Sequence, residues 1–216
     1  MKIRIIPSVI AKSQQEMEDK INLVKDYVKL IHLDIMDGVF VQNTSLNFDF
    51  RLPKTACEFE AHLMVQDPDN WVRENWEKAD TIIIPAKSCK NPEGMISFLK
   101  GKRKIGFALN PETPLEKVKD YLDQSDEVLI LTVKPGFYGS KFIPEVLEKV
   151  KELRHLKPEL NIEVDGGISP ATIKEAREAG ANFFVSGSYI MNSGNPKEAI
   201  KTLKNLCPVR NKSRGR

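Results

Sequence analysis

The fold is decided by the stretch Leu30-Ile31-His32-Leu33-Asp34-Ile35-Met36-Asp37-Gly38, in which apolar and polar residues alternate. Successive side chains of a strand point to opposite faces, so its isoleucines and leucines share one face, and His32, Asp34 and Met36 share the other. The apolar face is suited to packing against helices outside the sheet. The polar face then points to the other side, toward the interior of a closed sheet. The stretch therefore predicts a buried strand whose polar residues face the axis of a barrel.

Short apolar strands followed by amphipathic helices repeat along the whole chain. Eight strands are predicted, over residues 4–10, 28–37, 57–65, 80–86, 104–110, 127–133, 161–167 and 182–188. Seven helices are predicted, over residues 13–27, 67–79, 91–102, 113–124, 142–156, 169–179 and 195–206. The second strand is followed instead by a short irregular connection that contains Pro53.

Eight such units in 216 residues have 27 residues each, enough for one strand, one helix and two loops. This arithmetic predicts an α/β fold with one domain, a (β/α)8 TIM barrel over residues 1–206. An open doubly wound sheet is the alternative, but no Gly-x-Gly-x-x-Gly motif follows the first strand. Two helices are expected to start at Thr113-Pro114 and Ser169-Pro170, where a capping hydroxyl precedes a proline, and Gly180 is expected to end the second of these helices.

The composition is that of a globular domain, because 41% of the residues are hydrophobic and 29% are charged. The net charge of +3 arises in residues 207–216, which contain four basic and no acidic residues; the remainder has 29 basic residues against 30 acidic ones. We expect a basic, disordered tail there, and no binding of nucleic acid or membrane. Three scattered cysteines and the lack of a long apolar stretch predict a cytoplasmic protein.

Polar residues recur on the inward faces of two further predicted strands. The third strand repeats the alternation in Glu60-Ala61-His62-Leu63-Met64, and the seventh ends at Asp165. Functional groups of such barrels gather at the carboxyl ends of the strands. Each residue alone has a structural interpretation, a hydrogen-bonded histidine or a turn-forming aspartate. The combination favours a site for zinc, iron(II), manganese or cobalt, with the ligands His32, Asp34, His62 and Asp165.

Glycine-containing loops follow the last three predicted strands, at residues 132–140, 165–167 and 186–188. A glycine in one loop is ordinarily turn chemistry, but barrels commonly bind phosphate with backbone N–H groups of their last loops. A metal opposite a phosphate site suggests a phosphorylated ketose as substrate. The matching chemistry is proton transfer next to the carbonyl, in which the metal stabilises an enediolate and two carboxylates act on opposite faces. Such an exchange inverts a stereocentre.

The sequence resembles the ribulose-phosphate 3-epimerase family over residues 3–206. The motifs that carry the resemblance are Pro7-Ser8, His32 to Gly38, Phe40-Val41, Asn43, His62 to Met64, Asn110 to Pro114, Thr132 to Phe142, Glu163 to Gly167 and Gly187-Ser188. The resemblance implies a barrel of the ribulose-phosphate-binding type. It also implies an isomerase of the pentose phosphate pathway that interconverts D-ribulose 5-phosphate and D-xylulose 5-phosphate with one bound divalent metal ion.

The resemblance further implies a role for each matching residue. His32, Asp34, His62 and Asp165 would ligate the metal, with Asp34 as proton acceptor and Asp165 as proton donor in one direction. The substrate would contact Ser8, Met36, His62, Met64, Gly136, Phe137, Tyr138, Gly139, Gly166, Gly167, Gly187 and Ser188. The implied partners are a small-molecule sugar phosphate and further copies of the chain in a dimer or hexamer.

Four features of the chain depart from the family pattern. Pro85-Ala86-Lys87 follows the fourth strand, where the family usually carries a histidine and then a glutamate. The loop over the substrate contains Tyr138 and Ser140, Gln42 replaces a usual proline, and the second helix is shortened. These departures keep two alternatives open. One is a 3-epimerase of a related ketose phosphate such as D-allulose 6-phosphate, and the other is a non-catalytic barrel that binds metal or sugar phosphate.

Overall fold

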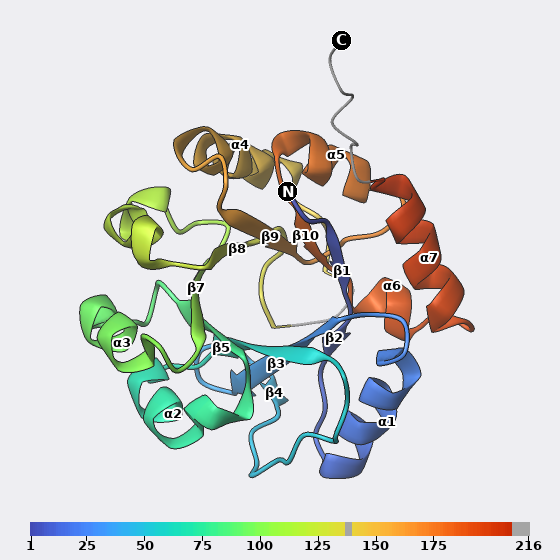
Figure 1. Cartoon of the computed structure of the whole chain (residues 1–216), viewed down its shortest axis with the longest axis horizontal. Helices are drawn as coiled ribbons and strands as arrows, with labels where there is room; N and C mark the ends of the chain where they lie inside the picture. The colour runs from blue at the N-terminus through green and yellow to red at the C-terminus, as the bar shows by residue number, and fades with distance from the viewer. Residues whose placement is uncertain (137–139, 209–216) are drawn as a thin grey trace.

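In the computed structural model, the chain folds into a barrel of parallel strands surrounded by helices (Figure 1). The structure describes residues 1–136 and 140–208. The strands are β1 (Arg4–Ile6), β2 (Ser8–Val9), β3 (Leu30–Asp37), β4 (Thr44–Ser45), β5 (Glu58–Met64), β6 (Thr81–Pro85), β7 (Lys104–Leu109), β8 (Glu127–Leu131), β9 (Asn161–Asp165) and β10 (Phe183–Val185). Every predicted strand contains at least one of these strands, and only β4 pairs in the antiparallel sense, with β3. The predicted (β/α)8 barrel is confirmed.

The barrel closes through its first strand segment, which Pro7 divides into β1 and β2. Hydrogen-bonded neighbours follow the order β1-β10-β9-β8-β7-β6-β5-β3-β2, so both ends of this path belong to one continuous segment. Proline has no N–H group to donate to a neighbouring strand. The Pro7 carbonyl nevertheless accepts the amide of His32 at 3.0 Å, and the Ile6 carbonyl accepts the amide of Ser186 at 2.8 Å. These two bonds join the segment to both of its neighbours.

Helices cover the outside of the barrel. They are α1 (Gln14–Val24), α2 (Pro68–Asn75), α3 (Pro92–Leu99), α4 (Leu147–Leu156), α5 (Ile173–Ala179), α6 (Ser188–Met191) and α7 (Pro196–Leu206), with 3-10 helices η1 (Trp76–Lys78), η2 (Leu115–Lys117), η3 (Lys119–Gln124) and η4 (Pro144–Val146). The main core lies between sheet and helices, and Ile31, Leu33 and Ile35 are buried in it. The apolar face predicted for this strand therefore packs as expected. Within residues 1–136 and 140–208, no helix is long and apolar enough to span a membrane.

The helix predicted over residues 113–124 is wrong, because η2 and η3 occupy this segment. An α-helix starting at Thr113 would direct the amide of Lys117 to the Thr113 carbonyl. That carbonyl instead accepts a hydrogen bond from Lys149 Nζ, which also binds the carbonyls of Asn110 and Pro111. The Lys117 amide turns to the carbonyl of Pro114 at 3.3 Å, a 3-10 bond. Lys149, distant in sequence, therefore takes the carbonyl of Thr113 that the first turn of the predicted α-helix would use.

Helix α5 begins later than the start predicted at Ser169. Residues 169–172 form a turn, in which the Ser169 amide donates to Thr172 Oγ1 at 3.0 Å and the Ser169 carbonyl accepts the Thr172 amide at 3.1 Å. Helix α5 follows at Ile173. Its predicted end is confirmed, because Gly180 has φ of +118° and its amide binds the carbonyls of the last turn.

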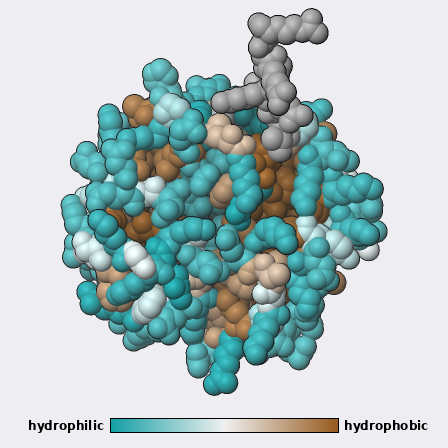
Figure 2. Space-filling view, in the orientation of Figure 1, coloured by the Kyte–Doolittle hydropathy of each residue, from teal (hydrophilic) through white to brown (hydrophobic). Residues whose placement is uncertain are grey.

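Hydrophilic residues cover most of the face shown in Figure 2, and hydrophobic side chains show between them in several places. Among described residues, the large hydrophobic side chains that are exposed are scattered, and the most exposed are Val39 and Met1. Cys57, Cys89 and Cys207 are all unpaired. Residues 209–216 of the predicted tail lie outside the described residues.

Candidate active site

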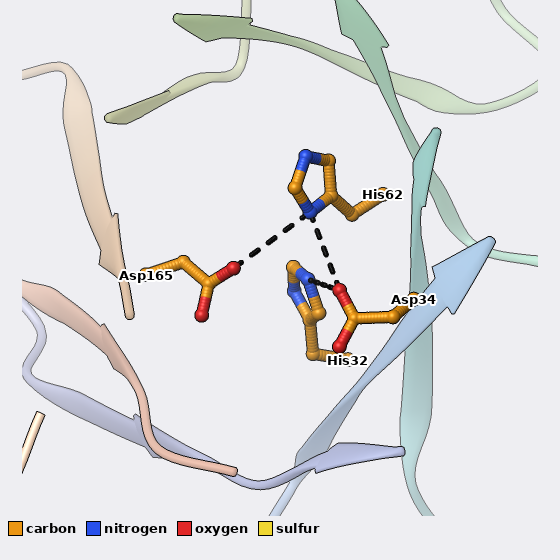
Figure 3. A group of neighbouring side chains, drawn as sticks. All are labelled: His32, Asp34, His62 and Asp165. Carbon is orange, nitrogen blue, oxygen red and sulfur yellow. Dashed lines mark ion pairs between the residues drawn. The ribbon is translucent and has the colours of Figure 1, made fainter. Parts of the chain in front are cut away.

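Four polar side chains meet inside the barrel at the carboxyl ends of three strands (Figure 3). His32 and Asp34 come from β3, His62 comes from β5, and Asp165 is the last residue of β9. Strands β3 and β5 pair so that Asp34 lies directly beside His62. The structure thus brings together all four residues that the sequence predicts as metal ligands, and Figure 3 shows them pointing toward one another.

Short distances join the polar atoms of this cluster. Asp34 Oδ1 lies 3.4 Å from His32 Nε2 and 3.4 Å from His62 Nδ1, which also lies 3.8 Å from Asp165 Oδ2. Both imidazoles are buried, and the most accessible of the four side chains, that of Asp165, is 14% exposed. Charged groups at such depth need close partners of opposite charge. The arrangement is therefore one that a bound cation would stabilise.

The donor set of the cluster fits a metal ion. Each of the four residues offers one ligand atom, and all four atoms lie within 4.8 Å of one another. His32 Nε2 and His62 Nδ1 are buried and form no hydrogen bond. A buried nitrogen without a partner is costly, whereas its lone pair can bind a metal. Burial also lowers the pKa of His62, which favours the neutral ring that ligates metals. The cluster can hold a divalent ion with two nitrogen and two oxygen ligands.

The two carboxyl groups of the cluster have pKa values displaced in opposite directions. Burial raises the pKa of Asp34, but His32 and His62, whose ring nitrogens lie 3.4 Å from its carboxylate, outweigh burial and hold this pKa well below its usual range. Burial and the negative charge of Asp34 raise the pKa of Asp165 to about 7. Carboxyl groups whose pKa values are pushed apart are typical of acid and base pairs. At neutral pH, Asp34 is ionised and Asp165 can hold a proton.

A pocket opens next to the cluster at the same end of the barrel. Its lining includes predicted site residues from six strands and the loops that follow them, namely Ser8, Asp34, Met36, Met64, Gly136, Asp165, Gly166, Gly167, Gly187 and Ser188. His32 and His62 are buried and do not line it. The predicted substrate contacts Phe137, Tyr138 and Gly139 lie outside the described residues. Ile10 and Leu131 also line the pocket, but their ordinary apolar character provided no signal in the sequence.

Gly166 and Gly136 shape the pocket wall through backbone conformations that favour glycine. Their φ angles are +105° and +111°. A Cβ atom on Gly166 would lie 2.3 Å from Cγ2 of Val133, so no side chain fits there. The hydroxyl of Thr132 donates to the carbonyls of Asp165 at 2.9 Å and Gly166 at 2.6 Å. Contacts between the ends of β8 and β9 therefore determine the position of Asp165.

A layer of buried carboxyl groups lies deeper in the barrel, and the sequence analysis assigned it no role. Glu60 and Glu163 precede His62 and Asp165 by two residues, and Glu127 is the first residue of β8. Residues two apart on a strand point to the same face. Glu60 and Glu163 could therefore have been found in the sequence as the residues two positions before His62 and Asp165. Glu127 is followed on its face by leucines, so no such signal pointed to it.

Comparison with known sequences relates the chain to one family. The model of the ribulose-phosphate 3 epimerase family matches residues 4–191. A ribulose-phosphate 3-epimerase of Bacillus subtilis is 34% identical over 213 residues, covering 94% of this chain and 98% of the relative. A ribulose-phosphate 3-epimerase of Synechocystis is 35% identical over 216 residues, with 94% of each chain covered. The residues that the family model matches include β3, β5 and β9, the strands that supply the cluster.

Solved structures with lower identity share the fold. A 3-hexulose-6-phosphate synthase has a TM-score of 0.69 at 16% identity, covering 94% of this chain and 99% of the other. A KGPDC from Streptococcus mutans has a TM-score of 0.70 at 16% identity, covering 95% of this chain and 97% of the other. At this identity, the two solved structures show a shared barrel fold only. The family model and the two relatives above match this chain in sequence as well. The chain therefore belongs to the ribulose-phosphate 3-epimerase family.

Proposed function

We propose that this protein inverts C3 of D-ribulose 5-phosphate to give D-xylulose 5-phosphate, a step of the pentose phosphate pathway. The observation that carries the proposal is the pair Asp34 and Asp165, whose carboxyl groups line one pocket and have pKa values displaced in opposite directions. Epimerisation next to a carbonyl needs one base and one acid. The name ribulose-phosphate 3-epimerase, which the relatives from Bacillus subtilis and Synechocystis carry, supports the choice of substrate.

Asp34 and Asp165 are the proposed catalytic residues. The ionised carboxylate of Asp34 accepts the proton from C3, and the protonated carboxyl of Asp165 donates a proton to the same carbon from the other face. In the reverse direction the two groups exchange roles. They reach the pocket from β3 and β9, and His62 Nδ1 lies 3.4 Å from one carboxylate and 3.8 Å from the other. Proton removal and return on opposite faces inverts the stereocentre.

His32, Asp34, His62 and Asp165 are the proposed ligands of one divalent ion, which is zinc, iron(II), manganese or cobalt. When bound, the ion supplies positive charge that stabilises the negative charge developing on the substrate oxygens. The burial of His32, Asp34 and His62 and the low exposure of Asp165 strengthen such electrostatic interactions. Elemental analysis of the purified protein identifies the ion.

The pocket lining supports a proposed position for the rest of the substrate. Met36 and Met64 are direct neighbours on β3 and β5 and form an apolar cluster with Val41, against which the carbon chain would pack. Ser8 is proposed to bind a substrate hydroxyl. Backbone N–H groups of the loops after β9 and β10 are proposed to bind the phosphate, from Gly166, Gly167, Gly187 and Ser188. Gly136, which lines the pocket after β8, is also proposed to contact the substrate, and the sequence predicts the same role for Phe137, Tyr138 and Gly139.

A second candidate function is a 3-epimerase of a six-carbon ketose phosphate such as D-allulose 6-phosphate. One feature favours this function, which is the departure from the family pattern at the end of β6. Pro85 is the last residue of this strand, and Lys87 lies two residues after it. Lys87 Nζ lies 3.2 Å from Glu112 Oε1, and both side chains are more than half exposed. An ion pair therefore stands beside β6 where the family pattern carries a histidine and a glutamate.

The two functions are separated by measuring kcat/KM for D-ribulose 5-phosphate and D-allulose 6-phosphate with the same metal-loaded sample. The proposed function predicts the higher value for the five-carbon substrate. Turnover of the six-carbon substrate alone would transfer the assignment to the second candidate. Turnover of neither substrate, in a sample shown by elemental analysis to contain its metal, would identify a non-catalytic binding barrel.

We also propose a cytoplasmic location and a homo-oligomeric state as a dimer or hexamer, and we restrict the proposed basic tail to residues 209–216, because Cys207, which the sequence assigned to the tail, is 3% exposed and belongs to the main core. The three unpaired thiols support a reducing compartment. Light scattering of the full chain tests the oligomeric state, and a monomer at all concentrations would contradict it. Deletion of residues 209–216 tests the tail, because an unchanged kcat/KM is expected if the tail serves only as a solvated terminus.

A further inference from the structure

The inward side chains of the barrel form two successive layers. Asp34, His62 and Asp165 belong to the layer nearer the pocket, and two residues earlier on the same strands lie His32, Glu60 and Glu163. The pairing of β3 with β5 places His32 beside Glu60 in the deeper layer, just as it places Asp34 beside His62 in the upper one. His32 is thus the single member of the four-residue cluster that comes from the deeper layer.

His32 contacts both layers through different ring nitrogens. Nε2 lies 3.4 Å from Asp34 Oδ1 in the upper layer. Nδ1 lies 2.7 Å from Glu60 Oε1 and 3.3 Å from Glu163 Oε1 in the deeper layer. The side chains of His32, Glu60 and Glu163 are all 0% exposed, so bulk solvent does not reach these contacts. The ring therefore bridges the cluster and the carboxyl layer.

We propose that Glu60 is a positioning residue that fixes the orientation and tautomer of His32. A carboxylate oxygen can only accept, so the 2.7 Å contact places a hydrogen on Nδ1 and leaves Nε2 as the nitrogen that can give up its proton to a metal ion. The lone pair of Nε2 then faces Asp34 and the centre of the cluster. Histidines that ligate metals are commonly held by such a carboxylate contact on their other nitrogen. The inference deepens the proposed function, because it rests on His32 serving as a ligand there.

Glu60 is the closer of the two glutamates that reach His32. Its contact with Nδ1 is 0.6 Å shorter than that of Glu163 and is a hydrogen bond. Both carboxyl oxygens of Glu163, in contrast, lack a hydrogen-bond partner. The backbone register also makes Glu60 the direct neighbour of His32 on the adjacent strand. Two independent features of the fold therefore assign the positioning role to Glu60.

Glu127 provides a matched control inside the same barrel. Its side chain is buried on β8 and one of its oxygens lacks a hydrogen-bond partner, as in Glu60. Its Cγ occupies space left by Gly106, where an added Cβ would lie 2.9 Å away. Within the described residues, Glu127 has neither a hydrogen bond nor an ion pair with His32. Replacing Glu127 therefore removes an interior carboxyl without removing the support of His32.

The test compares the binding of zinc(II) alone to the wild-type chain, Glu60→Leu, Glu60→Gln and Glu127→Gln, by competition with a chromophoric chelator. Loss of a carboxylate that supports a metal ligand typically weakens metal binding by about 10–100-fold. We expect this loss in Glu60→Leu and a smaller one in Glu60→Gln, whose amide oxygen can still accept the Nδ1 hydrogen. Glu127→Gln is expected to retain wild-type affinity.

Long-range 1H–15N NMR of the imidazoles gives a second readout, because the chain contains only three histidines. His32 of the wild-type protein with zinc bound is expected to carry its proton on Nδ1, and the His32→Ala spectrum provides the assignment. A proton on Nε2 would overturn the proposal even if Glu60→Leu failed to fold. Equal zinc affinity in Glu60→Leu and wild type, or equal losses in Glu60→Leu and Glu127→Gln, would also overturn it. Neither readout uses a substrate, so failure of the proposed epimerase activity remains distinguishable.

Discussion

Replacing Asp165 with asparagine should reduce the pH dependence of the free energy of unfolding of protein stripped of metal. Burial and the charge of Asp34 raise the pKa of Asp165 to about 7 in the folded protein, whereas an aspartate in an unfolded chain titrates near ~4. Between these values the folded state binds the extra proton. The stability that this group contributes is therefore fully present below about pH 4 and is lost as the pH rises through about 7.

The size of the effect follows from the difference between the two pKa values. One pKa unit corresponds to about 1.4 kcal/mol, so the full contribution of Asp165 is roughly 4 kcal/mol. Part of it is already lost below about pH 5, where the unfolded chain begins to release its proton. The remaining change between about pH 5 and about pH 8 is roughly 2–3 kcal/mol.

The assay is urea unfolding followed by circular dichroism, with excess chelator, at about pH 5 and about pH 8. The wild-type free energy of unfolding should fall between these pH values by about 2–3 kcal/mol more than that of Asp165→Asn. Other titrating groups are present in both proteins, so the difference reports Asp165 together with the groups coupled to it. Equal pH dependence in the two proteins, within about 0.5 kcal/mol, would refute the reasoning that burial and Asp34 hold a proton on this carboxyl.

Three further predictions concern the metal, the pocket and the fold. His32→Ala and His62→Ala should each lose bound metal in elemental analysis, and stoichiometric metal in both variants would show that the ligand set is wrong. Gly166→Ala should lower the free energy of unfolding by about 1–3 kcal/mol in urea, because a Cβ would clash at 2.3 Å where φ is +105°; wild-type stability would contradict the assigned strain. Lys149→Met should cost about 1–3 kcal/mol, because three carbonyls lose their donor, whereas Lys151→Met on the exposed face of α4 should stay within about 0.5 kcal/mol. Equal losses in the free energy of unfolding for the two lysine variants would contradict the role assigned to Lys149 in the formation of η2 and η3.

The strands and the barrel could be predicted because their signal is local. Alternation in residues 30–38 defines both faces of β3, and buried apolar runs such as Ile82 to Ile84 mark strands covered on both sides. The irregular connection after β3 was also predictable, because Pro53 and the lack of helical periodicity are visible in the chain. In each case the residues that decide the local structure are neighbours in sequence.

The errors arise where a side-chain contact binds a backbone group that the predicted helix start would use. The segment after β7 has a good capping pattern at Thr113, but Lys149 of α4 binds the carbonyl that the helix would use. Nothing within residues 113–124 indicates that lysine. At Ser169 the hydroxyl of Thr172 competes for the backbone of the same turn and donates to the carbonyl of Gly167 at 2.7 Å. Both cases are contacts of the folded protein that overrule a valid local preference.

The four residues of the cluster could be predicted from the sequence. The residues that hold them in position and the shifts of their pKa values could not all be predicted. His32, Asp34 and His62 stand out because histidine and aspartate are unusual on the inward face of a buried strand. The role of Glu60 depends on the pairing of β3 with β5, which places it beside His32. The opposite pKa displacements of Asp34 and Asp165 likewise depend on burial and on neighbours from other strands. These properties belong to the assembled barrel.

NMR of D-ribulose 5-phosphate in deuterated water with the metal-loaded protein tests the proposed epimerisation. The wild-type protein is expected to form D-xylulose 5-phosphate with deuterium at C3, and Asp34→Asn and Asp165→Asn are each expected to lose this product. A wild-type protein that contains its metal and leaves C3 unlabelled would contradict the account. Formation of labelled xylulose 5-phosphate at the wild-type rate by both variants would contradict it equally.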